Sequence, residues 1–204
     1  MIAIINYGLG NIKAIQNVYS KLSIPVRVVS NITEFGNIEK LILPGVGAFD
    51  YAMEKLKSSG MYEKINELVL EKEIPVIGIC VGFQMMAKSS DEGVLPGLGW
   101  IDARVKKFDS NKMNGKIQLP HMGWNDVDSI TENPLLDGLH KDAKFYFLHS
   151  YYVDCNDERQ AIATSNYADN FVCAVNFRNI YGVQFHPEKS HHFGVKLLEN
   201  FAKL

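Results

Sequence analysis

Short apolar runs alternate with helical patterns through the first half of this chain, and no other feature limits the possible fold as much. Four runs have the length and composition of buried strands, at residues 1–6, 25–29, 39–43 and 75–79. Apolar residues at helical spacing predict helices at residues 12–22, 49–56, 62–70 and 83–88. Strands that alternate with helices in this way favour a parallel sheet covered by helices on both faces.

The second half has a different pattern, in which strand-like runs follow one another with short turns. These runs lie at residues 100–108, 124–127, 143–152, 161–164, 171–176 and 180–185, and a final helix is predicted at 192–202. Many of these strands could pair antiparallel. We therefore expect one α/β domain over residues 1–204, with three layers: a mixed, mostly parallel central sheet flanked by helices, and extra antiparallel strands from the second half.

Composition narrows the class of protein. The chain has 204 residues, of which 47% are hydrophobic and 22% charged, so one domain can have a substantial core. The net charge of −2 and the scattered lysines and arginines argue against nucleic acid and acidic membranes as partners. No apolar run approaches the roughly 20 residues that span a bilayer. The start, MIAIINYGLGN, lacks a basic leader and is expected to form a strand, not a signal peptide.

The cysteines point to a reducing compartment. The chain has three, Cys80, Cys155 and Cys173, and an odd, sparse count does not suggest a disulfide framework. None forms a CxxC pair, which argues against a zinc site. We therefore expect a soluble cytoplasmic protein with no metal and no other cofactor.

Cys80 lies between two glycines where a predicted strand runs into a predicted helix. Residues Gly78 to Gly82 have the form G-x-C-x-G, a cysteine version of the nucleophile elbow. Such a turn lifts the sulfur clear of the sheet and places it near free N–H groups at a helix start, which favour the thiolate. The alternative is a buried cysteine that acts as a small apolar residue, and this interpretation suffices for Cys155 and Cys173.

A second pair of reactive side chains follows a later strand. In the segment YGVQFHPEKS, His186 and Glu188 are two residues apart, so in extended backbone they point to the same side. Pro187 between them stiffens the pair. Glu188 could then hold the imidazole of His186 while His186 exchanges a proton with Cys80. An isolated His-x-Glu pair would be a surface coincidence, but the cysteine elbow makes the catalytic interpretation stronger.

Backbone donors for an oxyanion are expected after the third strand. The segment LPGVGAF carries Gly45 and Gly47, and glycines in such a place expose backbone N–H groups. With Cys80 as nucleophile, this segment and the N–H of Val81 are the natural donors. A plain tight turn is the alternative interpretation of this segment.

Together the motifs resemble those of class I (triad) glutamine amidotransferases over residues 1–204. The chain is most similar to the HisH subunit family of imidazole glycerol phosphate synthase, through NYGLGN, PGVGAF, GICVGFQ, LPHMGWN, FYFLHSYY and GVQFHPEKS. The resemblance implies a glutaminase that hydrolyses L-glutamine to glutamate and ammonia. Cys80 would be the nucleophile, His186 the general acid and base, and Glu188 the carboxylate that orients His186.

The resemblance also implies residues that bind substrate and partner. Gln84 matches a residue that holds the polar end of glutamine, and the segment His149-Ser150-Tyr151 matches a wall of the same pocket. In the family, ammonia passes without release to water into a (βα)₈-barrel synthase subunit, which makes imidazole glycerol phosphate and AICAR in histidine biosynthesis. The positions that match this contact are Asn11, Trp124, Asn125, Tyr146 and Lys189. On residue type alone, Trp124 and Tyr146 could equally be core aromatics, and Lys189 a solvated surface charge.

Three other functions stay open at this level. His191 and His192 depart from the family pattern, so the chain could be a related subunit that supplies ammonia for amidino sugars of surface polysaccharide. It could also be a cysteine peptidase of related fold, or an assembly subunit without activity. Gln84 and the spacing of His186 and Glu188 favour the glutaminase, and the isolated chain is expected to have low activity.

Overall fold

The computed structural model describes residues 1–109, 118–139 and 142–204. Within these ranges, no helix is both long and apolar enough to cross a lipid bilayer. All three cysteines are free thiols, with Cys80 and Cys173 buried.

Eight strands of the described residues form one sheet in the order β2-β1-β3-β4-β13-β12-β11-β8. In that order their bounds are Val26–Val29, Ile2–Ile5, Lys40–Gly45, Val76–Cys80, Ile180–Val183, Asp169–Phe177, Ala161–Tyr167 and Asp128–Ser129. The first five are parallel, and the last three pair antiparallel. This arrangement confirms the predicted fold class, including the antiparallel strands of the second half.

The parallel strands bring the predicted reactive groups to one edge of the sheet. Gly45, at the end of β3, is in register with Cys80 at the end of β4. On the other side of β4, Val183 of β13 is in register with Ile79, so the chain after β13 continues beside Cys80. Ligands bind at this carboxyl edge in parallel α/β sheets.

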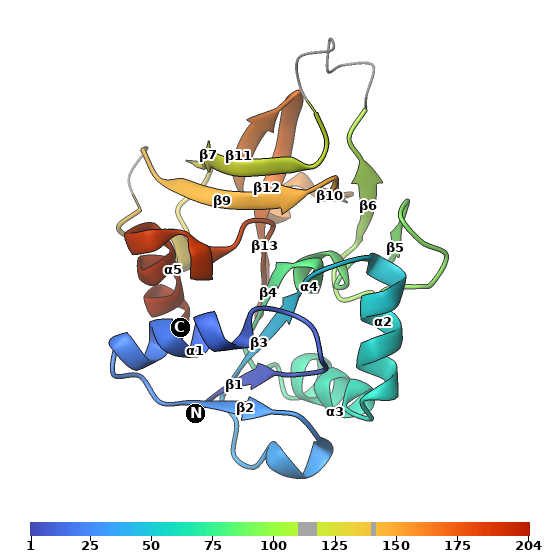
Figure 1. Ribbon diagram of the computed structural model, residues 1–204, viewed down its shortest axis with the longest axis vertical. Coiled ribbons are helices and arrows are strands. Elements are labelled where there is room, and N and C mark those ends of the chain that lie inside the picture. The colour runs from blue at the N-terminus through green and yellow to red at the C-terminus, as the bar shows by residue number, and fades with distance from the viewer. Residues whose placement is uncertain (110–117, 140–141) are drawn as a thin grey trace.

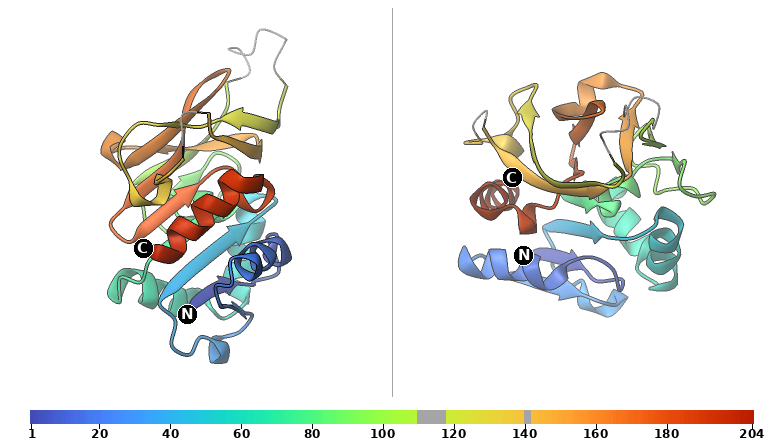
Figure 2. Two further views of the ribbon diagram at one scale, coloured as in Figure 1. Left: turned by 90° about the vertical axis from the view of Figure 1, so that its left-hand side faces the viewer. Right: turned by 45° about the horizontal axis from the view of Figure 1, so that its top comes forward.

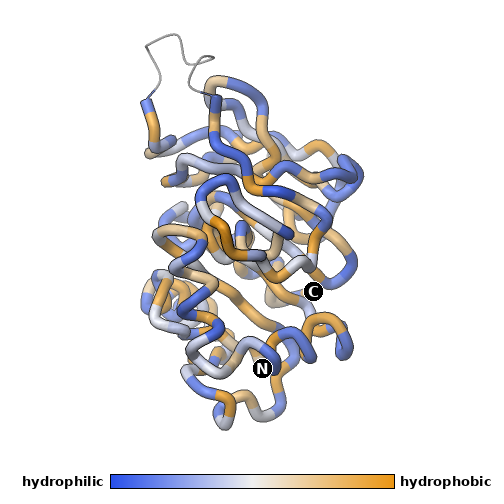
Figure 3. Tube along the Cα trace, turned by 90° about the vertical axis from the view of Figure 1, so that its right-hand side faces the viewer, coloured by the Kyte–Doolittle hydropathy of each residue, from blue (hydrophilic) through white to orange (hydrophobic). Residues whose placement is uncertain are grey.

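Helices cover both faces of the parallel part, with α1 and α5 on one face and α2 and α3 on the other (Figure 1). The helices are α1 (Ile12–Lys21), α2 (Phe49–Ser58), α3 (Tyr62–Asn66, continued by a π-turn at Glu67–Glu71), α4 (Val81–Gln84) and α5 (His191–Lys203). In α1, the buried residues Ile15, Val18 and Tyr19 form one stripe at helical spacing, as the sequence predicted. Buried residues of all these layers form one hydrophobic cluster. Figure 3 shows apolar segments through the middle of the molecule and polar ones at many outer turns.

Two small sheets complete the fold. Strands β7 (His121–Asp126) and β9 (Lys144–His149) form an antiparallel ribbon, which lies across the top of the parallel sheet beside α5 (Figure 2). Strands β10 (Tyr151–Cys155), β6 (Ala103–Lys107) and β5 (Ser89–Ser90) form a three-stranded sheet. We call the pair β7 and β9 the ribbon.

Two predicted elements differ from the structure for physical reasons. The helix expected at 83–88 begins at Val81 and is a single turn. The carbonyls of Met85, Met86 and Ala87 accept N–H groups from residues 98–101, so this loop takes the acceptors that a longer helix would use. The strand expected at 143–152 is broken at Ser150, because β9 pairs with β7 whereas β10 pairs with β6.

Candidate active site

Cys80 sits on a strained turn between β4 and α4. Its backbone has φ 55° and ψ −115°, a conformation that L-residues avoid and that costs about 1–3 kcal/mol. The flanking glycines make this turn possible. A Cβ at Gly82 would lie 1.9 Å from the carbonyl oxygen of Leu43, and one at Gly78 would lie 2.7 Å from the Cα of Phe83. Since α4 is one turn long, its dipole adds little, and the main support for a thiolate must come from side chains.

His186 is the ionisable side chain that lines the same cavity as Cys80 and is bound to Glu188. Its Nδ1 lies 2.9 Å from Oε1 of Glu188. Burial lowers the pKa of His186, but the hydrogen bonds and negative charges of Cys80 and Glu188 outweigh it and raise the pKa to about 10. Glu188 is 1% exposed, and its Oε2 has no partner among the described residues, so its charge depends on a protonated His186 for compensation.

The backbone reaches this geometry by a route that the sequence did not indicate. The predicted extended segment is a 3₁₀ turn, Pro187–Lys189, that starts directly after His186. Pro187 stands at the first position of the turn, where its missing N–H would have no partner anyway. The expected contact between His186 and Glu188 is therefore present, on a tighter backbone than we assumed.

The strand β9 holds His186 in place. The N–H of His186 donates to the carbonyl of Tyr146 at 2.8 Å. Ser190 is fully buried, and its hydroxyl donates to the carbonyl of His186 at 2.6 Å and accepts from the N–H of Tyr146 at 3.0 Å. Both backbone groups of Tyr146 are thus bound to the loop that carries His186.

A cavity of about 310 Å³ opens onto Cys80, near the lower end of the roughly 300–1,000 Å³ typical of small-molecule sites. Cys80 is only 3% exposed, yet it lines this cavity, which favours the nucleophile over the core cysteine of the alternative interpretation. The lining gathers nearly all of the predicted nucleophile, oxyanion and substrate positions: Gly47, Cys80, Val81, Gln84, His149, Ser150, Tyr151 and His186, together with Val46, Glu92, Pro120 and Leu148. Gly45 lies just behind, where a Cβ would be 2.3 Å from the N of Gly82.

Sequence comparison gives the family. The model for "Glutamine amidotransferase class-I" matches residues 3–204. This chain belongs to the class I glutamine amidotransferases. The imidazole glycerol phosphate synthase subunit HisH of Bdellovibrio bacteriovorus is 53% identical over 204 residues, and that of Leptospira interrogans 50%, in each case over the whole of both chains. This identity groups the chain with the HisH subunits.

Solved structures support the fold of this amidotransferase. A crystal structure of a glutamine amidotransferase superposes with a TM-score of 0.73 at 18% identity, over 98% of both chains. A structure of PurLQS from Thermotoga maritima gives 0.72 at 15% identity, over 99% of this chain and 97% of that one. At such low identity these matches concern the fold alone.

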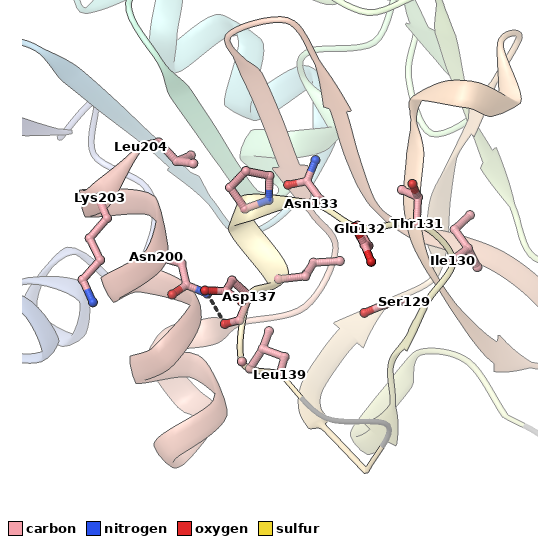
Figure 4. A pocket seen from close by; sticks show the side chains of 13 residues that line it. Ser129, Ile130, Thr131, Glu132, Asn133, Asp137, Leu139, Asn200, Lys203 and Leu204 are labelled. Carbon is pink, nitrogen blue, oxygen red and sulfur yellow. Dashed lines mark hydrogen bonds between the residues drawn. The ribbon is translucent and has the colours of Figure 1, made fainter.

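A larger cavity, of about 1110 Å³, lies between residues 129–139 and the end of α5, away from the family's motifs (Figure 4). Its buried polar side chain, Asn200, already donates to the carbonyls of Leu135 and Asp137. Its lining residues include no cysteine and no histidine, so the smaller cavity is the better candidate for the amidotransferase site.

The residues expected to contact a synthase fall into two groups. Trp124, Tyr146 and Lys189 lie together: the two rings are 6.2 Å apart, and Nζ of Lys189 is 5.3 Å from the centre of the Tyr146 ring. The side chain of Asn125 instead lies on the face of the ribbon opposite Trp124, where its amide donates to the carbonyl of Asn166. Asn11 lies at the start of α1. The partner contacts of all five stay predictions.

Three side chains of this site were missed at the sequence level. Gln184 is fully buried and its Nε2 lies 3.8 Å from Sγ of Cys80. Its place two residues before His186, on the same side of the chain, was a usable signal. Ser190 and Glu92 gave no such signal, because their contacts with Tyr146 and with the cavity come from distant parts of the chain.

Proposed function

We propose that this chain is the glutaminase subunit of an imidazole glycerol phosphate synthase. It would hydrolyse L-glutamine to glutamate and ammonia, and a (βα)₈-barrel synthase subunit would use the ammonia to make imidazole glycerol phosphate and AICAR in histidine biosynthesis. The observation that carries the proposal is that Cys80 and His186 line one cavity of amino-acid size, with Glu188 bound to Nδ1 of His186, in a chain related to HisH subunits over its full length.

In the first half-reaction, the Cys80 thiolate attacks the side-chain carbonyl carbon of glutamine. The carbonyl oxygen becomes an oxyanion, for which the backbone N–H of Val81 and those of the segment from Gly45 to Gly47 are the proposed donors. The C–N bond then breaks, protonated His186 gives its proton to the leaving nitrogen, and ammonia departs. A γ-glutamyl thioester on Cys80 remains.

In the second half-reaction, water hydrolyses the thioester. His186, neutral after the first step, takes a proton from the attacking water, and the C–S bond breaks to release glutamate and the thiolate. Glu188 keeps the Nδ1 side of the ring bound in both steps, so the opposite nitrogen stays directed at Cys80.

Two side chains of the cavity suit the rest of glutamine. The NH₂ group of Gln84 is fully used, because it donates to the carbonyl of Tyr151 at 2.9 Å and to Oε1 of Gln184 at 3.0 Å. Only the Gln84 carbonyl oxygen is left for substrate, where it can accept from an N–H. Glu92 brings a carboxylate to the cavity lining, a suitable partner for the α-ammonium group.

The synthase would dock on the outer face of the ribbon. Met122 is 65% exposed, Trp124 46% and Leu148 37%, and the alternation of each strand turns them away from the core. His191 stacks on Trp124 with the ring centres 4.9 Å apart and the planes within 5°. A contiguous apolar face beside the cavity mouth is the kind of surface that a partner receiving ammonia must cover. The free cysteines fit a cytoplasmic enzyme.

The test is a glutaminase assay on the full chain, alone and with the barrel subunit that co-purifies with it. We expect glutamate release from L-glutamine, low for the chain alone and strongly raised by the partner, and loss of all of it in Cys80→Ala. Cleavage of a peptide panel without glutamine turnover would support the cysteine peptidase instead and would overturn the proposal. Ammonia transfer only to a sugar acceptor would support the surface-polysaccharide subunit.

A further inference from the structure

Two histidines outside the proposed line of Cys80, His186 and Glu188 are buried side by side, and one of them, His149, lines the cavity. His121 of β7 is 3% exposed and His149 of β9 is 6% exposed. The two residues are directly opposite each other in the ribbon, and Nδ1 of His121 lies 3.0 Å from Nε2 of His149. No part of the proposed reaction uses His121, so its burial calls for another explanation.

A single carbonyl fixes the tautomers of both rings. Nδ1 of His149 lies 2.8 Å from the carbonyl oxygen of Tyr151, which can only accept, so Nδ1 carries the proton. Nε2 of a neutral His149 is then an acceptor, and Nδ1 of His121 must be the donor. Nε2 of His121 accepts in turn from the amide of Asn125 at 3.2 Å.

Both rings are therefore neutral. A second proton on His149 would make its Nε2 a donor facing the N–H of His121, and the bond between them would be lost. Burial agrees with this, since it lowers the pKa of His121 to about 4 and that of His149 to about 3.

The hydrogen bonds continue from this pair to the nucleophile. The carbonyl of Tyr151 accepts from His149 and also from Nε2 of Gln84. The same Gln84 nitrogen donates to Gln184, whose own Nε2 reaches Sγ of Cys80. The orientation of the Gln84 amide, and so the one oxygen that it offers to substrate, depends on a carbonyl whose other donor is His149.

We propose that His121 is a positioning residue for glutamine binding, which acts by holding the ring of His149 in place at the wall of the cavity. This inference rests on the proposed glutaminase function. Without the N–H of His121, the buried Nε2 of His149 has no donor, and its ring is no longer held from that side. His149 lines the cavity, so a displaced ring changes the wall that glutamine must fit and weakens the bond to the Tyr151 carbonyl, which Gln84 shares.

The surroundings of His121 allow the hydrogen bond to be removed without the ring. His121 is stacked between Phe147, 4.7 Å away at 18°, and Tyr167, 3.9 Å away at 17°. His121→Phe keeps a stacked ring and loses the donor, whereas His121→Asn keeps a donor near the Nδ1 position and loses the ring. Tyr167→Phe is a matched control, since it keeps its ring against His121 and loses only a hydroxyl bond to the carbonyl of Gln118.

The experiment measures covalent labelling of the full chain by intact-protein mass spectrometry with two probes. One is the glutamine analogue 6-diazo-5-oxo-L-norleucine, in which the diazo carbon takes a proton, bonds to Sγ and loses N₂. The other is iodoacetamide, which reports the reactivity of the thiol without the glutamine pocket. We expect His121→Phe to raise the half-saturating concentration of the glutamine analogue about tenfold. The rate of iodoacetamide labelling should stay within twofold of wild type. Tyr167→Phe should match wild type with both probes, and His121→Asn should recover most of the loss.

A purely structural role predicts the opposite order, because Asn, which loses the stacked ring, would be the more harmful replacement. Equal half-saturation in His121→Phe and wild type, or a larger loss in His121→Asn than in His121→Phe, would overturn the inference while leaving the glutaminase intact. A wild-type chain that reacts with iodoacetamide and not with the glutamine analogue would instead overturn the proposed function, and the inference with it.

Discussion

Removing the hydroxyl of Ser190 tests whether the ribbon positions His186, the proposed general base. In Ser190→Ala, the buried N–H of Tyr146 loses its acceptor, while the carbonyl of His186 keeps one donor, the N–H of Lys189 at 3.0 Å. An unpaired buried group costs about 1–3 kcal/mol and a lost hydrogen bond about 1 kcal/mol. We therefore expect the free energy of unfolding to fall by about 2–4 kcal/mol.

Activity should fall further than stability alone explains. The Ser190 hydroxyl fixes the backbone that carries the His186 ring. Its loss should therefore slow proton transfer without weakening the binding of glutamine. We expect kcat for glutamine hydrolysis to drop at least tenfold with KM within about twofold. Urea unfolding followed by tryptophan fluorescence gives the stability, and glutamate release with the partner subunit gives the kinetics.

Ser165 provides the matched control. It is 2% exposed, and its hydroxyl donates to the carbonyl of Asp126 at 2.7 Å, on the ribbon but away from His186. Ser165→Ala should lose about 1 kcal/mol of stability with kcat unchanged. If Ser190→Ala is destabilised as expected but keeps the wild-type kcat, Ser190 is only a structural residue, and the positioning argument is refuted.

Three further predictions follow from the described contacts. Cys80→Ala should lower the pKa of His186 from about 10, because the thiolate is one of the groups that raise it; an unchanged value in histidine NMR titrations would contradict this. Burial lowers the pKa values of His121 and His149 below the unfolded value of about 6.5. The contribution of the two neutral rings to the stability of the fold is therefore complete above that pH and is lost as pH falls toward 4. Between these pH values, the pair should change the free energy of unfolding by up to about 2–3 kcal/mol per pH unit. Urea unfolding at several pH values should find this slope roughly halved in His121→Phe. Gly82→Ala should leave the chain largely unfolded by circular dichroism, because the added Cβ would lie 1.9 Å from a carbonyl oxygen of β3.

Local pattern predicted the parallel half of the fold well, because each strand and helix there buries residues at its own period. The burial of β4 and the stripe of α1 are examples. The pattern failed where a distant segment competes for backbone groups. Nothing within residues 83–88 reveals that the loop at 98–101 will take the carbonyls of Met85 to Ala87 and end α4 after one turn.

The site shows the same division. The glycines around Cys80 and the spacing of His186 and Glu188 are local features of the sequence. Each of these features predicted a contact that the structure describes. Trp124 and Asn125 were assigned together to a partner surface by resemblance, and their partner contacts stay predictions. Neighbours in a strand point to opposite faces, and the Asn125 amide is bound to the carbonyl of Asn166. The period of the strand could have predicted that these two side chains lie on different faces of the ribbon.

The ribbon and the sheet support different parts of the site, which has a mechanical consequence. Cys80 is fixed by β4 in the middle of the parallel sheet, whereas His186 is bound to β9 through Tyr146 and Ser190. The wall around Gln84 is bound to the same ribbon through the paired histidines. We therefore expect a partner that docks on the outer face of the ribbon to act on His186 and on the wall around Gln84 together, and to leave Cys80 where it is. Because the ribbon and the sheet hold different parts of the site, docking should change kcat and KM without changing the strained backbone of Cys80.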